Sequence, residues 1–345
     1  MIKRPTLKDI AGRAGVSVST VSYALNDAST VALSPDTRAR VRRIAKELGY
    51  IPNSLAQSLR SRTSRSIGMI VTKPLSNPRY AAIVQGASAA LATERMHLTI
   101  LTDAAAPHDL DDYRSGRLDG VVFVGHDDEA APTVVLDAAR DEGLPLVVLD
   151  CGAPPADVPY STVDFDYAGG ATALLDELAE RGVRSVLHVR PEVSSRAERL
   201  REKALVGALA RHPGLSLRVV TTGVTDDVLR AIEQDPELTR DYARDLGSAI
   251  DTALTAVNGE AAETAVLCSW GADVEPAMAS RRVREDGILV AALAAGTLSP
   301  RVWPQLRYSR LPLARAGAEA ARLIMQEIAG GGHEHLVLAP ELDRP

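Results

Sequence analysis

The 345-residue sequence is short of cysteine and aromatic residues, and it has no long apolar run. Its two cysteines, Cys151 and Cys268, are too few for a disulfide scaffold, and each follows an apolar run, so we expect buried free thiols. No segment approaches about 18 uninterrupted apolar residues, and the N-terminus lacks a signal-peptide pattern. These absences indicate neither secretion nor membrane insertion, and we expect a cytoplasmic protein.

The sequence also lacks the common catalytic motifs. It has no GxxxxGK, no HExxH, and no GxGxxG after the first expected strand, and neither cysteine has the spacing of a metal ligand. The run His333-Glu334-His335 could suggest a metal, but after three consecutive glycines a solvated loop is the favoured interpretation. We therefore expect no enzymatic activity, no metal and no cofactor.

What the sequence has is a small aliphatic core and an uneven charge. Apolar residues make up 46% and aromatic residues 3%, which suits an α/β core of two or three domains. The first 66 residues hold twelve Lys and Arg against four acids, about +8, which leaves 27 basic and 41 acidic residues, about −14, for the remainder. A basic module on an acidic body is typical of a nucleic-acid-binding head.

The basic segment has the pattern of three short helices. Thr6 can cap the first, with Asp9 in capping-box position, and Gly15 ends it. Ser17 can cap the second, and Ser34-Pro35 starts the third. The second helix turns small apolar residues inward and a polar face outward. Two helices joined by a tight glycine turn predict a helix-turn-helix.

Two runs in this segment, TLKDIAGRAGVSVSTVSYALN and PDTRARVRRIAKELGYIPNSLAQSLRS, resemble the head and hinge of the lactose/galactose repressor (LacI/GalR) family. The resemblance implies that the second helix lies in the major groove of DNA. There Val18 could pack on a thymine methyl, and Ser19 and Tyr23 could bond base edges. Family members often have Arg where Tyr23 stands, which leaves the operator sequence open. The DNA-contacting residues that we expect are Thr6, Ser17, Val18, Ser19, Thr20, Ser22, Tyr23, Asn26, Tyr50, Asn53, Ala56, Leu59 and Arg60.

The segment 53–61 is helical by pattern but too short to be stable alone. The resemblance implies a hinge helix that folds on DNA beside its twin, with Leu59 wedged into the minor groove. The alternative is that Leu55 and Leu59 pack on the head.

The remainder alternates apolar strand runs with helical stretches. One series starts at IGMIV (67–71) and a second at RSVLHVR (184–190), which predicts two lobes with doubly wound parallel sheets and a ligand cleft between them. The fold expected is thus an all-α head with a hinge helix and a two-lobed body like that of periplasmic binding proteins. The expected limits are 1–50 for the head, 51–66 for hinge and linker, and 67–342 for the body, with a first lobe of about 67–159 and 308–331 and a second of about 160–306 and 333–342.

The resemblance extends over the body but weakens at the pocket. Where most relatives carry Asn-Asp, this chain reads Ser269-Trp270-Gly271, and where they carry Gly-Phe-Asp-Asp it reads ALAA (292–295). Two carboxylates that bind sugar hydroxyls are missing, so the effector is less polar than a sugar, is stacked on Trp270, or is absent. The effector-contacting positions that we expect are Asn77, Tyr80, Asp164, Arg199 and Trp270.

The whole pattern predicts a transcriptional regulator, most simply a repressor, that binds a pseudo-palindromic operator as a homodimer. Its first-lobe helices, such as 81–91, are expected to form the dimer contact. Two alternatives stay open. The body could be a dimerisation scaffold without an effector, or the chain could be a solute-binding receptor.

Overall fold

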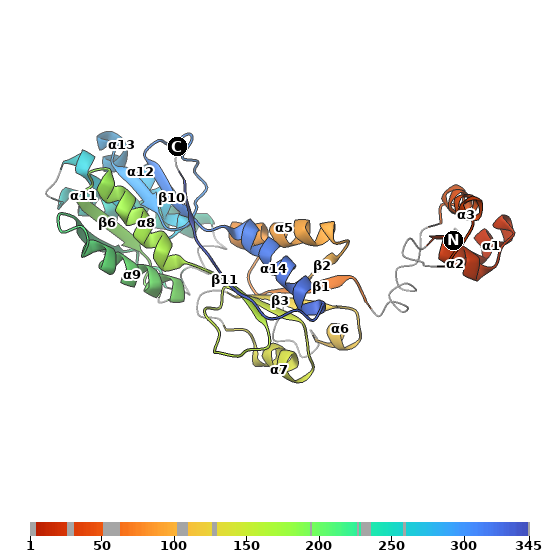
Figure 1. Cartoon of the computed structure of the whole chain (residues 1–345). Helices are drawn as coiled ribbons and strands as arrows, with labels where there is room; N and C mark the ends of the chain where they lie inside the picture. The colour runs from red at the N-terminus through yellow and green to blue at the C-terminus, as the bar shows by residue number, and fades with distance from the viewer. Residues whose placement is uncertain are drawn as a thin grey trace. The chain divides into compact units, whose positions relative to one another are not determined.

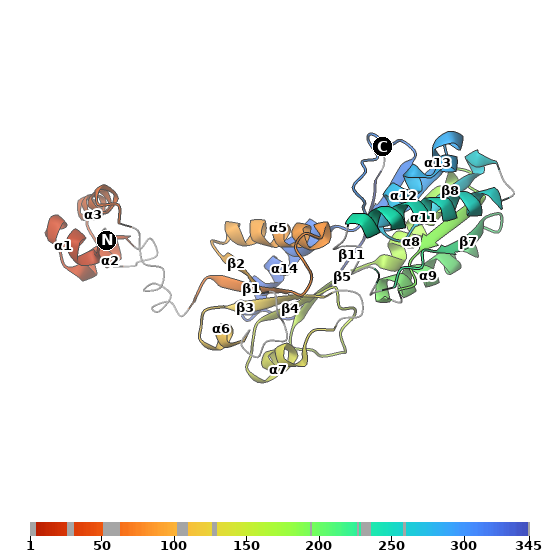
Figure 2. The same ribbon diagram turned by 180° about the vertical axis from the view of Figure 1, so that it is seen from behind.

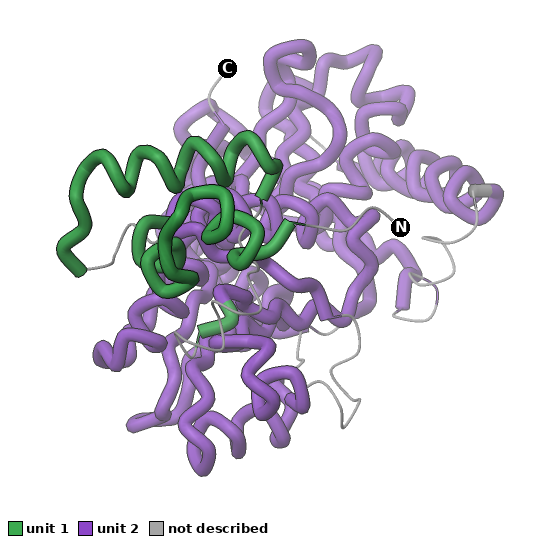
Figure 3. Tube along the Cα trace, turned by 90° about the vertical axis from the view of Figure 1, so that its right-hand side faces the viewer, with its two compact units in different colours: residues 1–64 green, residues 65–345 purple. Residues whose placement is uncertain are grey.

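The computed structural model describes residues 5–25, 31–50, 63–101, 110–125, 130–193, 195–225, 228, 236–257 and 260–343. The chain divides into two compact units, Met1–Ser64 and Arg65–Pro345 (Figure 3). This boundary falls inside the segment that the sequence assigns to the hinge and linker.

The first unit is a three-helix head made of α1 (Leu7–Ala14), α2 (Val18–Leu25) and α3 (Pro35–Glu47). Thr6 and Asp9 form the expected capping box, and Gly15 ends α1 in the left-handed region at φ 64°. The core is small and aliphatic, and it contains Ile10, Ala11, Ala14, Val21, Ala24, Val41, Ile44 and Ala45. The helix starts expected at Thr6, Ser17 and Ser34 are confirmed, as is the end of α1 at Gly15.

The second unit contains two six-stranded sheets (Figure 1). The first has the order β11-β5-β4-β3-β1-β2, and the registers of its strands are all parallel. Side chains alternate between its two faces, since Val122 and Val124 of β3 pack on one side while Val121 and Phe123 pack on the other. Its strands are β1 (Ser66–Val71), β2 (His97–Leu101), β3 (Gly120–Val124), β4 (Leu146–Leu149), β5 (Ser161–Phe165) and β11 (His335–Leu338).

The second sheet has the order β12-β10-β9-β8-β6-β7 and is parallel except for the short β12, which pairs antiparallel with β10. Its strands are β6 (Ser185–Arg190), β7 (Ser216–Thr221), β8 (Thr264–Cys268), β9 (Leu289–Ala292), β10 (Leu306–Arg310) and β12 (Glu341–Leu342).

Helices cover both faces of each sheet (Figures 1 and 2). On the first sheet, α5 (Pro78–Thr93) and α14 (Leu313–Ile328) lie side by side on one face, with α6 (Asp111–Arg114) and α7 (Thr133–Asp141) on the other. On the second, α8 (Tyr167–Glu180) and α9 (Arg196–Leu209) cover one face. The opposite face carries α11 (Pro236–Thr255), α12 (Val274–Ala279) and α13 (Arg281–Asp286), and two short 3-10 turns, η1 (Ala261–Glu263) and η2 (Gly271–Asp273), flank β8.

The contact between α5 and α14 depends on glycine. A Cβ added at Gly86 would lie 1.8 Å from the carbonyl oxygen of Ala314, and one at Gly317 would lie 2.0 Å from that of Ile83. The two backbones approach too closely for any side chain at these positions. These helices therefore form a rigid pair on the first sheet.

The two-lobed doubly wound fold is confirmed, but the expected lobe limits are wrong in part. Strands β5 and β11 belong to the first sheet, not the second, and β10 belongs to the second sheet. The chain therefore crosses between lobes after β5, after β10 and after β11. Neither β10 nor β11 was recognised as a strand. β10 (LRYSR) lacks an apolar run, and β11 (HLVL) is only four residues long.

Two further outcomes concern features that the sequence lacks. Cys268 is a buried free thiol as expected, whereas Cys151 is only half-buried, because it lies in the loop after β4. Among the described residues, no helix has both the length and the apolar character needed to cross a membrane.

Candidate nucleic-acid interface and effector cleft

The outward face of α2 is the candidate DNA-reading surface. Val21 and Ala24 are fully buried and hold the helix against the head core, whereas Val18 and Tyr23 are 40% and 41% exposed. Ser19 is exposed between them. Val18 and Tyr23 thus leave apolar surface beside Ser19 that is available for contact. The three residues expected to read bases therefore share one accessible face.

Some hydroxyls that we expected on phosphates already hold the helix starts. The Ser17 hydroxyl accepts a hydrogen bond from the Thr20 backbone N–H at 3.1 Å and bonds the Thr20 hydroxyl at 2.8 Å. The exposed Thr6 hydroxyl lies 2.7 Å from the Asp9 carboxylate. Each of these groups is placed at a helix N-terminus, where the backbone amides favour an anion.

The other expected DNA contacts differ in how far the structure places them. Ser22 is half-buried on α2, and Tyr50 is half-buried against the head core. Tyr50 therefore has a packing role in the head. Asn26, Asn53, Ala56, Leu59 and Arg60 lie outside the described residues.

In the body, charged side chains meet between the lobes, and we call Arg79, Asp150, Asp164, Tyr167 and Arg196 the charged cluster. Asp150 follows β4 and is buried, and it accepts hydrogen bonds from the guanidinium of Arg79, from the Tyr167 hydroxyl at 2.9 Å and from Arg196 at 2.9 Å. Arg196 also donates to both Asp164 oxygens, at 2.9 and 2.8 Å. Because Arg196 begins α9 of the second lobe, it ties that lobe to two carboxylates of the first.

Tyr167 lies at the centre of the cluster, and burial raises the pKa of its hydroxyl. The hydroxyl therefore stays protonated and can donate to Asp150 while it accepts from Arg79 at 2.7 Å. The guanidinium of Arg201 lies 5.1 Å from the Tyr167 ring centre and donates to the Leu293 carbonyl oxygen at 2.9 Å. Arg201 therefore links α9 to the end of β9 and helps to hold the charged cluster in place.

The structure treats the five expected effector positions differently. Asn77 is the N-cap of α5 and accepts from the Arg79 backbone N–H at 3.0 Å, and Tyr80 is buried in the first-lobe core. Arg199 is exposed on α9, so its neighbours Arg196 and Arg201 face the cleft in its place. Asp164 belongs to the charged cluster, and Trp270 lines a separate cavity. Asn77 stays partly exposed, whereas Tyr80 is only 1% exposed.

Sequence reasoning missed Arg79, Asp150, Tyr167, Arg196 and Arg201. One signal was available for Asp150, because a carboxylate that ends an apolar strand run in an open α/β sheet faces the ligand crevice. The arginines carried no comparable signal. Two of them, Arg196 and Arg201, lie within three residues of the predicted Arg199, and the sequence alone does not tell which face of α9 is covered.

The two places where sugar-binding carboxylates are missing pack against each other. A Cβ added at Gly271 would lie 2.1 Å from the Ala295 carbonyl oxygen, and one at Gly296 would lie 2.6 Å from the Gly271 oxygen. Ser269 is buried and bonds the His188 ring at 2.9 Å. The two departures from the pattern of the relatives, at 269–271 and at 292–295, therefore fit each other, because no acidic side chain fits at Gly271 in this arrangement.

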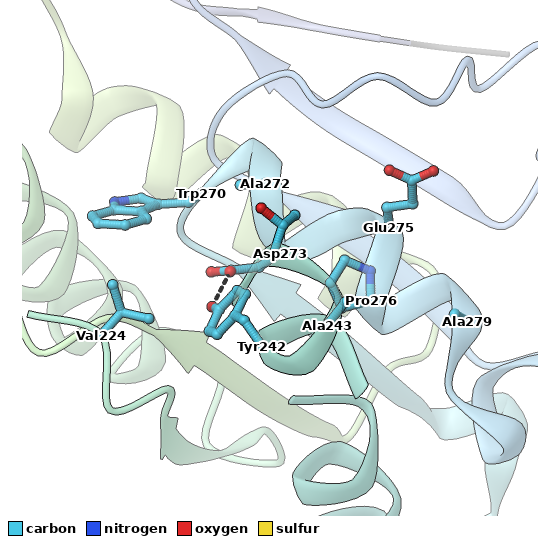
Figure 4. Close-up of a pocket in the computed structure, with 10 residues that line it drawn as sticks. Val224, Tyr242, Ala243, Trp270, Ala272, Asp273, Glu275, Pro276 and Ala279 are labelled. Atoms are coloured by element: carbon cyan, nitrogen blue, oxygen red, sulfur yellow. Dashed lines mark hydrogen bonds between the residues drawn. The ribbon is translucent and has the colours of Figure 1, made fainter. Parts of the chain in front are cut away.

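The second lobe contains a cavity on the other side of Trp270. Trp270 lines a cavity of about 200 Å³ together with residues of α11 and α12 (Figure 4). The cavity lies at the carboxyl ends of β7 and β8, which is the edge of the second sheet where a doubly wound fold binds ligands.

Comparisons with known proteins agree with this geometry. Residues 6–53 match the family model for bacterial regulatory proteins of the lacI family. The HTH-type transcriptional regulator CelR of Thermobifida fusca is 30% identical over 98% of this chain and 96% of its own length. A solved CelR–cellobiose complex has a TM-score of 0.58 at 26% identity and covers 99% of both chains. The lac repressor dimer bound to operator and the anti-inducer ONPF has a TM-score of 0.71 at 21% identity, with 99% and 98% covered.

A basic helix-turn-helix head followed by a two-lobed body like that of periplasmic binding proteins defines a DNA-binding regulator of transcription. With a full-length relative at 30% identity, the chain belongs to the lacI family of bacterial regulatory proteins.

Proposed function

We propose that the protein binds a pseudo-palindromic operator as a homodimer, acts in the cytoplasm as a repressor rather than as an enzyme, and is modulated by a small molecule at the interlobe cleft. The observation that carries the DNA-binding part is the face of α2, where Val18, Ser19 and Tyr23 are exposed together above a buried anchor. A helix presented in this way fits the major groove.

Each exposed residue has a proposed role. Val18 contacts a thymine methyl, while Ser19 and Tyr23 bond base edges. The hydroxyls of Ser17 and Thr20 at the start of α2 contact phosphates, which fix the register without reading sequence. The outer contacts proposed for Asn53, Ala56, Leu59 and Arg60 complete this interface from the hinge.

The dimer contact is proposed on the first lobe. The outward face of α5 carries Ala81, Gln85, Ser88 and Ala89, none of which is charged. Beside it, β2 forms the edge of the first sheet, and its Leu98 and Ile100 are only half-buried. An uncharged helix face next to a half-buried edge strand suits a contact between two copies.

Coupling between ligand and DNA follows from the charged cluster. Arg196 of the second lobe holds Asp150 and Asp164 of the first, so a ligand that changes the lobe spacing must rearrange these pairs. Strand β1 follows the linker directly, and a shift of the first lobe in each subunit would therefore alter the separation of the two linkers.

The internal pairing of Asp150 and Asp164 also favours a second candidate, a body that serves as a scaffold without an effector. In that case the cleft carboxylates exist to fix the lobes and bind nothing. The solute-binding receptor is less well supported, because it gives no role to the basic head.

The test is selection of binding sites from random duplex DNA by the wild type, Tyr23→Phe and Tyr23→Ala. We expect Tyr23→Ala to change the base preferred at one position of each half-site, at a cost of about 1–3 kcal/mol for the original base. Tyr23→Phe separates the hydroxyl from the ring. An unchanged preferred site in both variants would contradict the assignment of α2.

A further inference from the structure

The cavity beside Trp270 contains a buried carboxylate that lacks a full set of partners. Asp273 is fully buried, and its Oδ1 accepts a hydrogen bond from the Tyr242 hydroxyl at 2.5 Å. Its Oδ2 is also buried and has no hydrogen-bond partner among the described residues. Buried carboxylate oxygens are nearly always paired, since an unpaired one is costly. Figure 4 shows the Asp273 carboxylate and the Tyr242 hydroxyl directed toward the space bounded by Trp270 and Val224.

The ordinary structural role of an aspartate at this position is not fulfilled. Asp273 is the N-cap of α12, where such a side chain would normally accept from the first backbone amides of the helix. It makes no capping hydrogen bond. The carboxylate is turned away from the helix that it precedes and toward the cavity, so helix capping does not explain the burial of its charge.

The charges around the cavity have one sign. Its described lining includes two carboxylates, Asp273 deep inside and Glu275 at the exposed rim, and no Lys, Arg or His. Glu198, on the neighbouring α9, also acts on Asp273, but it is paired with Arg201 at 3.4 Å, so its own charge is compensated there. The rest of the wall is largely apolar, with Val224, Trp270 and Pro276. A cation with an apolar body is the ligand chemistry that such a wall stabilises.

We propose that this cavity binds a small organic amine, whose ammonium group donates to Asp273 Oδ2 and whose apolar part packs on Trp270 and Val224. As an effector site this rests on the proposed function, but the binding itself does not. Cavity size limits the ligand, since an apolar cavity of about 150 Å³ accommodates benzene. The 200 Å³ here fits one ring with a short aminoalkyl group.

Benzylamine and its uncharged counterpart benzyl alcohol are suitable probes for calorimetry on the full chain at pH 8. The Trp270 fluorescence provides a second signal, read in a Trp303→Phe background because the chain has two tryptophans. We expect benzylamine to bind about ten- to a hundredfold more tightly than benzyl alcohol, as for a hydrogen bond to a charged group. Asp273→Asn should abolish this difference, and Glu275→Gln should change it by less than about threefold, as for an exposed charge.

The pH dependence adds a signature that a structural role would not give. Burial raises the pKa of Asp273 to about 6, so benzylamine affinity should rise between pH 5 and pH 8 as the carboxylate ionises. The other titratable groups near Asp273 are Tyr242, Cys268, Glu198 and Glu275. Burial raises the pKa values of Tyr242 and Cys268, so both stay neutral in this range. In Asp273→Asn the rise should disappear.

The outcomes separate this inference from the proposed function. Benzylamine that fails to bind the wild type at millimolar concentration, or that binds Asp273→Asn equally well, would overturn the amine site. Operator binding measured on the same samples without benzylamine tests the DNA-binding part of the proposed function. Benzylamine binding by a chain that selects no DNA site would overturn the proposed function and leave the amine site standing.

Discussion

Each lobe contains a buried carboxylate, and the two carboxylates differ in how many hydrogen bonds they receive. In the first lobe, Asp150 receives hydrogen bonds from Arg79, Tyr167 and Arg196, so both of its carboxylate oxygens have donors within the protein. In the second lobe, the described residues give Asp273 one hydrogen bond, from Tyr242, and give its other oxygen none. The comparison separates a carboxylate that holds the lobes together from one that leaves room for a ligand. Burial alone does not distinguish the two, because both side chains are nearly inaccessible.

The largest effect is expected from removing Asp150, the carboxylate whose two oxygens both have hydrogen-bond donors. Asp150→Ala leaves Arg79, Arg196 and the Tyr167 hydroxyl without their shared acceptor. We expect a loss of about 3–5 kcal/mol in the free energy of unfolding, as when one partner of a buried ion pair is removed. Urea unfolding followed by circular dichroism measures it.

Asp176→Ala is the matched control for this change. Asp176 also forms close pairs with two basic side chains, Arg211 and His212, but it is partly exposed. Solvent screening should limit its loss to below about 1 kcal/mol. Equal losses in the two variants would mean that the cluster gains nothing from its burial between the lobes.

The head and the cleft also differ in how far their sequences predicted them. In the head, each helix boundary has a local cause, such as the capping box at Thr6 and the glycine at Gly15, so the sequence was enough. In the body, the strand and helix order could be predicted because apolar runs are local as well. Strand β10 was not predicted because most of its residues are polar, and it is buried only through contacts that are distant in sequence.

The cleft residues could be predicted least. Arg199 and Arg201 are two positions apart on α9, yet only Arg201 is buried, and the difference depends on how α9 packs on α8 and on the ends of β8 and β9. Asp273 reads as an ordinary helix cap in the sequence. Its unpaired oxygen becomes evident only when Tyr242, 31 residues earlier, is brought beside it.

A pH titration sharpens the comparison within the second lobe. Burial lowers the pKa of His188 from 6.5 to about 4, so the unfolded chain takes up this proton first and stability is lost as the pH falls from about 6.5 to 4. Burial raises the pKa of Asp273 to about 6, so the folded chain takes up that proton first and stability is gained over a similar range. The two effects oppose each other in the wild type.

Asp273→Asn removes one side of this balance. We expect the variant to lose about 2 kcal/mol more stability than the wild type between pH 7 and pH 4.5, from the usual 1.36 kcal/mol per pKa unit. His188→Gln should have the opposite effect on the slope. Parallel stability curves for Asp273→Asn and the wild type would show that Asp273 is ionised in the folded chain even in acid.

The smallest effect, and the most direct test of the comparison, is the removal of one hydroxyl from each lobe. Tyr167→Phe leaves Asp150 with two arginines, so we expect a loss of about 1 kcal/mol at pH 8. Tyr242→Phe leaves ionised Asp273 with no hydrogen bond from the described residues, and the loss at pH 8 should be about 1.5–3 kcal/mol. At pH 5 that loss should shrink, because Asp273 is then largely protonated and its burial costs less. Urea unfolding at both pH values measures the four quantities. If the Tyr242→Phe loss were as small as that of Tyr167→Phe at pH 8, Asp273 would have another donor, and the contrast between a saturated and an unsaturated carboxylate would not hold.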